Sequence, residues 1–176
     1  MRRADVPGGD EAGSETACIT CGGGLQGREL CRNITKAYAE WQRRFMMPHS
    51  FSYIADARTR ALVIGSMPGE ASLAAGEYYA HRHNLFWRFV FEAYGEPFDP
   101  KAPPAYGVKT GLLLAHGVGL WDAAESCARE GSLDSDIRDA VPNDFVALFA
   151  LRPGIGRLLF NGQAAFTLFC RFNKVL

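Results

Sequence analysis

Three short, mostly apolar runs constrain the fold of this chain more than any other feature. They are residues 61–65 (ALVIG), 118–122 (VGLWD) and 157–161 (RLLFN), and each ends at a small or polar residue. Apolar runs of this length, bounded in this way, are typical of strands that are buried on both faces of a parallel sheet.

Helical patterns separate and follow these runs. We expect helices over about 84–94, 111–116, 145–149 and 163–172, and we expect Asn143 to be the N-cap of the third. Strands that alternate with helices favour an α/β fold in which a short central parallel sheet carries helices on both faces.

The N-terminal part of the chain has a different character. Residues 1–31 are rich in Gly, Glu and Asp and show hardly any apolar periodicity, so we expect a disordered or poorly packed extension before a domain over 32–176. One amphipathic helix ending at Pro48 is predicted near the start of that domain from an apolar stripe: Ile34, Tyr38, Trp41 and Phe45.

Composition narrows the function classes. The 176 residues are 48% apolar and 22% charged, which is typical of one globular domain. The formal net charge is zero, so any contact with nucleic acid must be local. No apolar stretch approaches the length of about 18 residues that a membrane helix needs, and no signal core follows Met1. We therefore expect a cytoplasmic monomer without a membrane partner.

The five cysteines favour a reducing compartment because their number is odd and their spacing irregular. Cys18, Cys21 and Cys31 are the only metal-like grouping, and the next candidate ligand, His49, is 18 residues beyond Cys31. A zinc site needs a fourth ligand, so we expect no metal. Two further cysteines are expected to be buried free thiols: Cys127 and Cys170.

Ligands of such sheets bind beyond the carboxyl ends of the strands. Residues 65–69 (GSMPG), 121–122 and 161–162 would lie there. The glycines and the proline of the first segment indicate a tight loop whose backbone amides can approach a ligand. The segment lacks the lysine and the glycine spacing of a phosphate-binding or dinucleotide-binding loop.

Residues 78–87 (YYAHRHNLFW) combine aromatic, histidine and amide side chains. Aromatic rings stack on flat bases, and an amide can hydrogen-bond both a base edge and a water. The alternative is a surface loop that leads into a core helix. We expect Trp87 and Phe89 to belong to the core.

This block resembles the hypoxanthine (deoxyinosine) DNA glycosylases of the uracil-DNA glycosylase superfamily. Their pattern G-S-M-P-G, S-L, Y-Y-A-H-P-R-N-x-F-W is matched by residues 65–87. Further matching blocks cover about residues 49–172: His49-Ser50-Phe51, Gly119-Leu120-Trp121-Asp122, Cys127, residues 129–134 (REGSLD), Asn143-Asp144-Phe145 and residues 160–164 (FNGQA).

The resemblance implies a three-layer fold like that of uracil-DNA glycosylase and an enzyme that needs no cofactor. It implies hydrolysis of the N-glycosidic bond of deaminated bases, chiefly hypoxanthine, in double-stranded or single-stranded DNA. Asn84 lies at the family's catalytic position, and Phe86 at that of the aromatic on which the flipped base stacks. The base preference among hypoxanthine, uracil and xanthine stays open.

The remaining site residues are expected around the base. The floor of the base pocket would come from Gly65, Ser66 and Met67. Asn161 could read a base edge or cap the following helix, and Asp122 could be an acceptor in the pocket. A serine nucleophile at position 66, with His81 or His83 as its base, would need an arrangement that this family does not use.

DNA contacts are expected at His81, Arg129 and Ser132. For His81 the alternative is a hydrogen bond to a neighbouring carbonyl, and for the other two a surface turn with a capping serine.

Two departures from the family pattern qualify the resemblance. Arg82-His83 stands where the family has Pro-Arg, and the family's last strand and Ser/Thr-Pro-Ala loop are expected to be missing after Leu176. Because that loop enters the DNA beside the flipped base, the alternative function is a truncated, catalytically weak or inactive DNA-binding remnant.

Overall fold

The computed structural model describes residues 29, 32–37 and 47–174. The chain divides into two units, Met1–Gln42 and Arg43–Leu176. In the first unit residues 32–37 are helical, as the apolar stripe predicts at Ile34. The rest of that stripe, most of the expected N-terminal extension and three of the cysteines lie outside the described residues: Tyr38, Trp41, Phe45, Cys18, Cys21 and Cys31.

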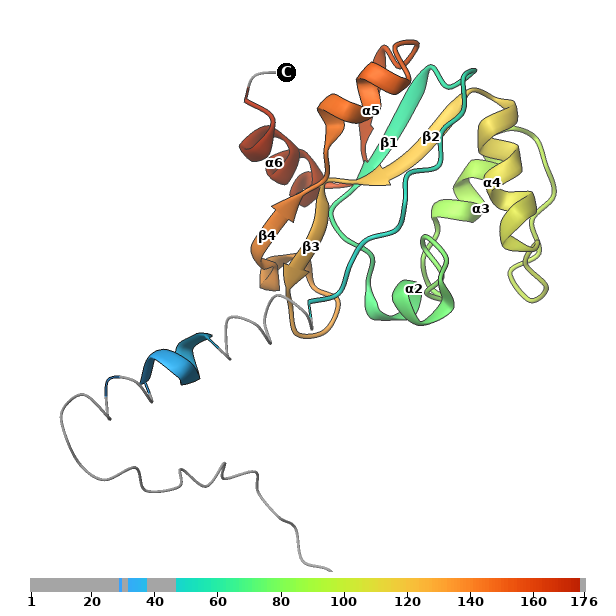
Figure 1. Cartoon of the computed structure of the whole chain (residues 1–176). Coiled ribbons are helices and arrows are strands. Elements are labelled where there is room, and N and C mark those ends of the chain that lie inside the picture. Colours follow the sequence, from blue (N-terminus) through green and yellow to red (C-terminus); the bar gives the residue numbers. More distant parts are fainter. Residues whose placement is uncertain (1–28, 30–31, 38–46, 175–176) are drawn as a thin grey trace, which may run out of the picture. The chain divides into compact units, whose positions relative to one another are not determined.

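A three-stranded parallel sheet forms the centre of the second unit (Figure 1). β1 (Ala61–Gly65) lies between β2 (Val118–Asp122) and β5 (Arg157–Phe160). In this register Gly65 is the partner of Asp122. The three predicted strands are confirmed, and their carboxyl ends meet at one edge of the sheet.

Helices cover both faces of the sheet, as predicted. Figure 1 shows α3 (Phe86–Ala93) and α4 (Tyr106–Ala115) on one side, and α5 (Phe145–Leu151) and α6 (Gln163–Phe172) on the other. Residues of β1 alternate between two cores. Leu62 and Ile64 pack with α5 and α6, while Val63 packs against the cluster that contains α3 and α4 residues. The fold is therefore three-layered.

Four elements near the carboxyl ends were not predicted. They are α2 (Glu70–Ala75), the antiparallel hairpin of β3 (Ala124–Ala128) and β4 (Arg138–Pro142), and the short helix η1 (Asp134–Asp136). The hairpin strands have five residues each, and their register shifts twice, so no period-2 pattern marks them in the sequence. α4 also begins earlier than expected, at Tyr106.

Three expectations were wrong. The N-cap of α5 is Asp144, whose side chain accepts a hydrogen bond from the Ala147 amide at 2.9 Å, because the side chain of Asn143 is turned into the interior. Phe89 is 69% exposed because it lies on the side of α3 away from the buried Trp87. Cys170 is exposed, whereas Cys127 is buried as predicted.

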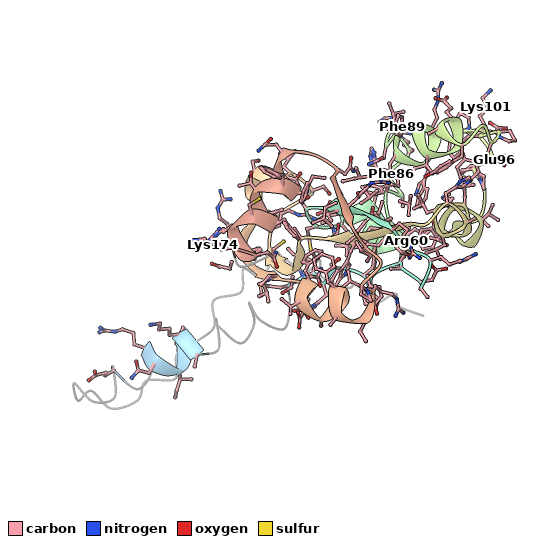
Figure 2. All side chains as sticks on the ribbon, turned by 90° about the horizontal axis from the view of Figure 1, so that it is seen from above. Arg60, Phe86, Phe89, Glu96, Lys101 and Lys174 are labelled. Carbon is pink, nitrogen blue, oxygen red and sulfur yellow. The ribbon has the colours of Figure 1, made fainter. Side chains whose placement is uncertain are left out.

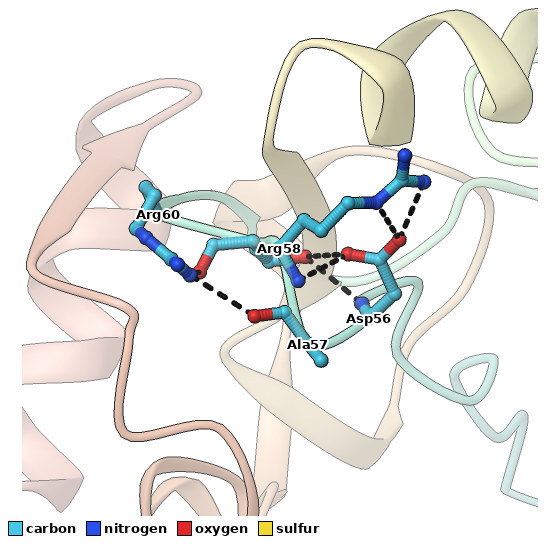
Figure 3. Close-up of polar contacts among 5 residues, drawn as sticks. Asp56, Ala57, Arg58 and Arg60 are labelled. Atoms are coloured by element: carbon cyan, nitrogen blue, oxygen red, sulfur yellow. Dashed lines mark hydrogen bonds and ion pairs between the residues drawn. The ribbon is translucent and has the colours of Figure 1, made fainter.

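A polar turn leads into β1. The Asp56 carboxylate accepts hydrogen bonds from the Arg58 backbone amide and guanidinium at 2.9 Å each, and the Arg60 guanidinium donates to the Ala57 carbonyl at 3.0 Å (Figure 3). These bonds fix the direction in which the chain enters the central strand. In the described part of the chain, no helix has the length and apolar character needed to cross a bilayer.

Replacing Gly119 by alanine should destabilise the domain by about 1–3 kcal/mol, because a Cβ there would lie 2.7 Å from the backbone oxygen of Ile54. Gly156→Ala is the matched control, since nothing lies within 4 Å of its Cβ position. Urea unfolding of both variants checks this. Equal stability of the two would show that the contact at β2 is not tight.

Candidate functional site

A cavity of about 340 Å³ lies where the carboxyl ends of the three strands meet. It brings together seven of the nine predicted site residues: Gly65, Ser66, Met67, His81, Asn84, Ser132 and Asn161. Its lining also includes Tyr79, Asp122 and Asp134. Phe86 and Arg129 are not among its lining residues. Segments that are far apart in the sequence therefore form one concave site, as the parallel sheet predicts.

The floor of the cavity requires glycine at position 65. A Cβ atom there would overlap Asp122 Oδ1 and would lie 3.1 Å from the Tyr79 hydroxyl oxygen. Because the Asp122 carboxyl could not stay in place beside a larger residue, Gly65 is required by the close approach of that side chain rather than by its backbone angles.

Asp122 is a carboxyl group in the wall of the cavity that is only 2% exposed. Burial raises its pKa to about 7, although the hydrogen bond from Ser50, the nearby Tyr78 hydroxyl and the charge of Arg129 lower it, and Asp134 raises it further. The Ser50 hydroxyl donates to Oδ2 at 2.6 Å.

Asn143 holds the strand end that carries this carboxyl. Its amide nitrogen donates to the carbonyls of Asp122 at 2.8 Å and Ala124 at 3.1 Å. Sequence reasoning missed this role and assigned Asn143 to helix capping. The sequence did contain a signal: Asp144, the next residue, can also cap a helix. With Asp144 as the N-cap of α5, the side chain of Asn143 is left for another role.

The loop after α2 is fastened at several backbone atoms. The Tyr78 amide donates to the Tyr106 hydroxyl at 3.2 Å, and its carbonyl accepts from the Trp87 indole at 2.7 Å. The Ala80 amide donates to the Ser72 hydroxyl at 3.2 Å. Between these points Tyr79 has a φ of 56°, a left-handed conformation that is strained for a tyrosine. The loop thereby holds the Tyr79 hydroxyl over Gly65.

Asn84 is exposed at the mouth of the cavity. Its backbone amide donates to the His81 carbonyl, and its Oδ1 accepts from the Phe86 amide, both at 2.8 Å. Among the described residues its Nδ2 has no hydrogen-bond partner, so this amide group can donate toward the cavity.

Phe86 is half-buried behind Tyr79. The two rings pack at a centroid distance of 4.0 Å and an interplanar angle of 34°. Figure 2 places Phe86 and the exposed Phe89 at the α3 end of the domain. The tyrosines that line the cavity are Tyr78 and Tyr79, and Phe86 supports the second of them from behind.

The GSMPG loop is held by polar contacts from the segment after β3. The Ser66 hydroxyl donates to Asp134 Oδ1 at 2.5 Å, which argues against a serine–histidine nucleophile pair. Ser132 Oγ accepts from the Glu70 amide at 2.9 Å, and the Arg129 guanidinium donates to the Pro68 carbonyl. Met67 packs its side chain into a small core with Ala124 and Cys127.

The described residues contain no cluster of three or more His, Cys, Asp or Glu side chains suited to a metal ion. The polar groups that the cavity offers are therefore carboxyl, hydroxyl, amide and imidazole groups of the chain itself.

Asp122→Asn should stabilise the domain more at pH 8 than at pH 5. Between about pH 4 and 7 the folded chain holds a proton on Asp122 that the unfolded chain has lost, so this group's contribution to stability falls as the pH rises through that window. The cost above pH 7 is at most about 4 kcal/mol. Urea unfolding from pH 5 to pH 8 measures it.

The control is Glu130→Gln, which removes an exposed carboxylate. A stability difference between wild type and Asp122→Asn that does not change with pH would contradict the raised pKa of Asp122.

Comparison with known proteins identifies the family. Two hypoxanthine DNA glycosylases are similar to this chain. The one from Methanosarcina acetivorans is 37% identical over 120 residues, which are 68% of this chain and 74% of the relative. The one from Methanosarcina barkeri is 33% identical over 118 residues, which are 67% and 73%. No protein-family model matches.

The fold has a solved counterpart. The solution NMR structure of a Methanosarcina acetivorans protein assigned as a uracil DNA glycosylase matches 72% of this chain and 78% of its own length, with a TM-score of 0.60 and 34% identity. The resemblance seen in the sequence, the three-layer fold and these relatives agree: the chain belongs to the hypoxanthine DNA glycosylase family of hydrolases.

Proposed function

We propose that this chain is a base-excision repair glycosylase that removes deaminated bases, chiefly hypoxanthine, from double-stranded or single-stranded DNA. The observation that supports this most is the position of the Asn84 amide at the mouth of a cavity whose inner wall holds Asp122. A cavity of about 340 Å³ also falls within the usual size of small-molecule sites, of about 300–1,000 Å³.

The charge distribution fits local contact with DNA. The formal net charge is zero, but Arg82, His81, His83 and Arg88 are exposed in or next to the loop that carries Asn84. Arg88 pairs with Glu92 at 2.8 Å, which leaves Arg82 and the two histidines as the groups that can approach phosphates. Contacts of this kind position a duplex without reading its sequence.

The reaction needs an extruded nucleotide whose base enters the cavity while its sugar stays at the mouth. The C1′–N9 bond breaks and its electron pair stays with the base. A water oxygen then bonds to C1′, one proton of that water is released, and the departing base gains a proton. Negative charge develops on the base in the transition state, and fixed neutral donors stabilise it.

Asn84 is suited to this step because its orientation is set in advance. Its Oδ1 is held by the Phe86 amide, so Nδ2 is directed away from α3 and can donate to the leaving base. Oδ1 has a second lone pair that can hold the attacking water. An amide does not accept a proton at neutral pH, so the role of Asn84 is to position and stabilise.

Asn84→Asp should lower the single-turnover rate of excision from a duplex with one deoxyinosine by about 100-fold or more, because one donor to the developing charge is lost. The Asp carboxylate can still accept from the Phe86 amide, so the melting temperature should stay close to that of the wild type. Asn84→Ala also removes this hydrogen bond and should cost about 1 kcal/mol of stability in addition.

Asn173→Ala is the matched control. Its amide donates to the Phe169 carbonyl at the end of α6, and it does not line the cavity, so its excision rate should equal that of the wild type. Excision by Asn84→Asp at the wild-type rate would remove Asn84 from the chemistry. No excision of hypoxanthine by the wild-type chain would overturn the proposed function.

A further inference from the structure

Two polar atoms approach the same point at the floor of the cavity. Asp122 Oδ1 and the Tyr79 hydroxyl oxygen both lie within 3.1 Å of the point that a Cβ on Gly65 would occupy. The Tyr79 hydroxyl has no hydrogen-bond partner in the described structure. The hydrogen bond from Ser50 goes to the other carboxylate oxygen, Oδ2. Buried polar atoms are almost always paired, so an unpartnered Tyr79 hydroxyl beside the Asp122 carboxyl in a cavity wall indicates a ligand.

The pair has a definite hydrogen-bond pattern. Above the pKa of about 7 the ionised Asp122 carboxylate only accepts, and the Tyr79 phenol hydroxyl can donate. The lactam edge of hypoxanthine presents the complement, because N1–H is a donor and the adjacent O6 is an acceptor. Adenine presents the reverse pattern, an acceptor at N1 and an amino donor at C6. Adenine in this position would place its N1 acceptor against the Asp122 acceptor, which leaves both groups without a donor. The Tyr79 hydroxyl can also accept from an amino group, so the discrimination against adenine comes from Asp122.

We infer that Asp122 and Tyr79 read the lactam edge of the extruded base, with Asp122 Oδ1 accepting N1–H and the Tyr79 hydroxyl donating to O6. This inference rests on the proposed function and names the feature by which a deaminated base is told from adenine. Uracil and xanthine carry the same N–H and carbonyl pair, and so does guanine. The pair therefore selects against adenine and cytosine.

The surroundings hold both readers in place. Asn143 fixes the backbone of Asp122, and Ser50 fixes its second oxygen. The left-handed backbone of Tyr79 directs its hydroxyl over Gly65. The Phe86 ring packs on the Tyr79 ring, so Phe86 is a positioning residue for the reader of O6.

The test compares two bases in the same duplex: hypoxanthine, and unsubstituted purine, which lacks both N1–H and O6. The measured quantity is the ratio of their single-turnover excision rates. Asp122→Leu should lower the preference for hypoxanthine by about 10–100-fold, the value of a hydrogen bond to a charged group. Tyr79→Phe keeps the ring and should lower it by about 3–10-fold.

Matched controls separate reading from stability. Asp99→Leu and Tyr94→Phe make the same changes away from the cavity and should leave the ratio unchanged. Asp122→Asn keeps an acceptor oxygen and should retain most of the preference, so it serves also if Asp122→Leu does not fold. If Asp122→Leu does not fold, the inference is supported by two results together. Asp122→Asn keeps the preference for hypoxanthine, and Tyr79→Phe has a reduced preference.

The outcomes distinguish the two proposals. This inference alone is overturned if the wild-type chain excises hypoxanthine while both variants keep the full preference. The two variants are Tyr79→Phe and a folded variant at position 122. A wild-type chain that excises neither base overturns the proposed function and this inference with it. A loss of rate that is equal for hypoxanthine and purine assigns Asp122 a structural role and also overturns the inference.

Discussion

The close packing of Asp122 against Gly65 is the contact on which the site depends. The two residues are register partners at the carboxyl ends of β1 and β2, and the missing side chain of Gly65 makes room for a buried carboxyl group. Ser50 then donates to that carboxyl group, and Asn143 donates to the backbone carbonyl of Asp122. Burial destabilises the ionised form of Asp122, as its raised pKa shows. Carboxyl groups with perturbed pKa values are common where a protein binds a ligand.

Most of the architecture could be predicted because it depends on local patterns. Apolar runs closed by small or polar residues marked β1, β2 and β5, and their parallel arrangement placed Gly65, Asp122 and Asn161 at one edge of the sheet. The position of Asn84 came from a resemblance between motifs. The structure adds that its side-chain oxygen is held by the start of α3, which leaves the amide nitrogen to act.

The parts that could not be predicted depend on contacts between residues far apart in the sequence. Ser50 meets Asp122 from 72 residues away, and no local pattern records that hydrogen bond. The hairpin of β3 and β4 has an irregular register, so it lacks a readable alternation. Phe86 fits the family pattern for a stacking aromatic, but whether its ring or that of Tyr79 faces the cavity depends on the backbone at Tyr79.

A crystal structure of the Asn84→Ala variant with a duplex that contains one deoxyinosine tests the account most directly. We expect the hypoxanthine base to lie extruded over Gly65, with N1 facing Asp122 Oδ1, O6 facing the Tyr79 hydroxyl, and the sugar beside position 84. A base that stays stacked in the duplex, or one that occupies the neighbouring cavity lined by Pro100, Pro103 and Lys109, would contradict the assignment of this cavity as the base site.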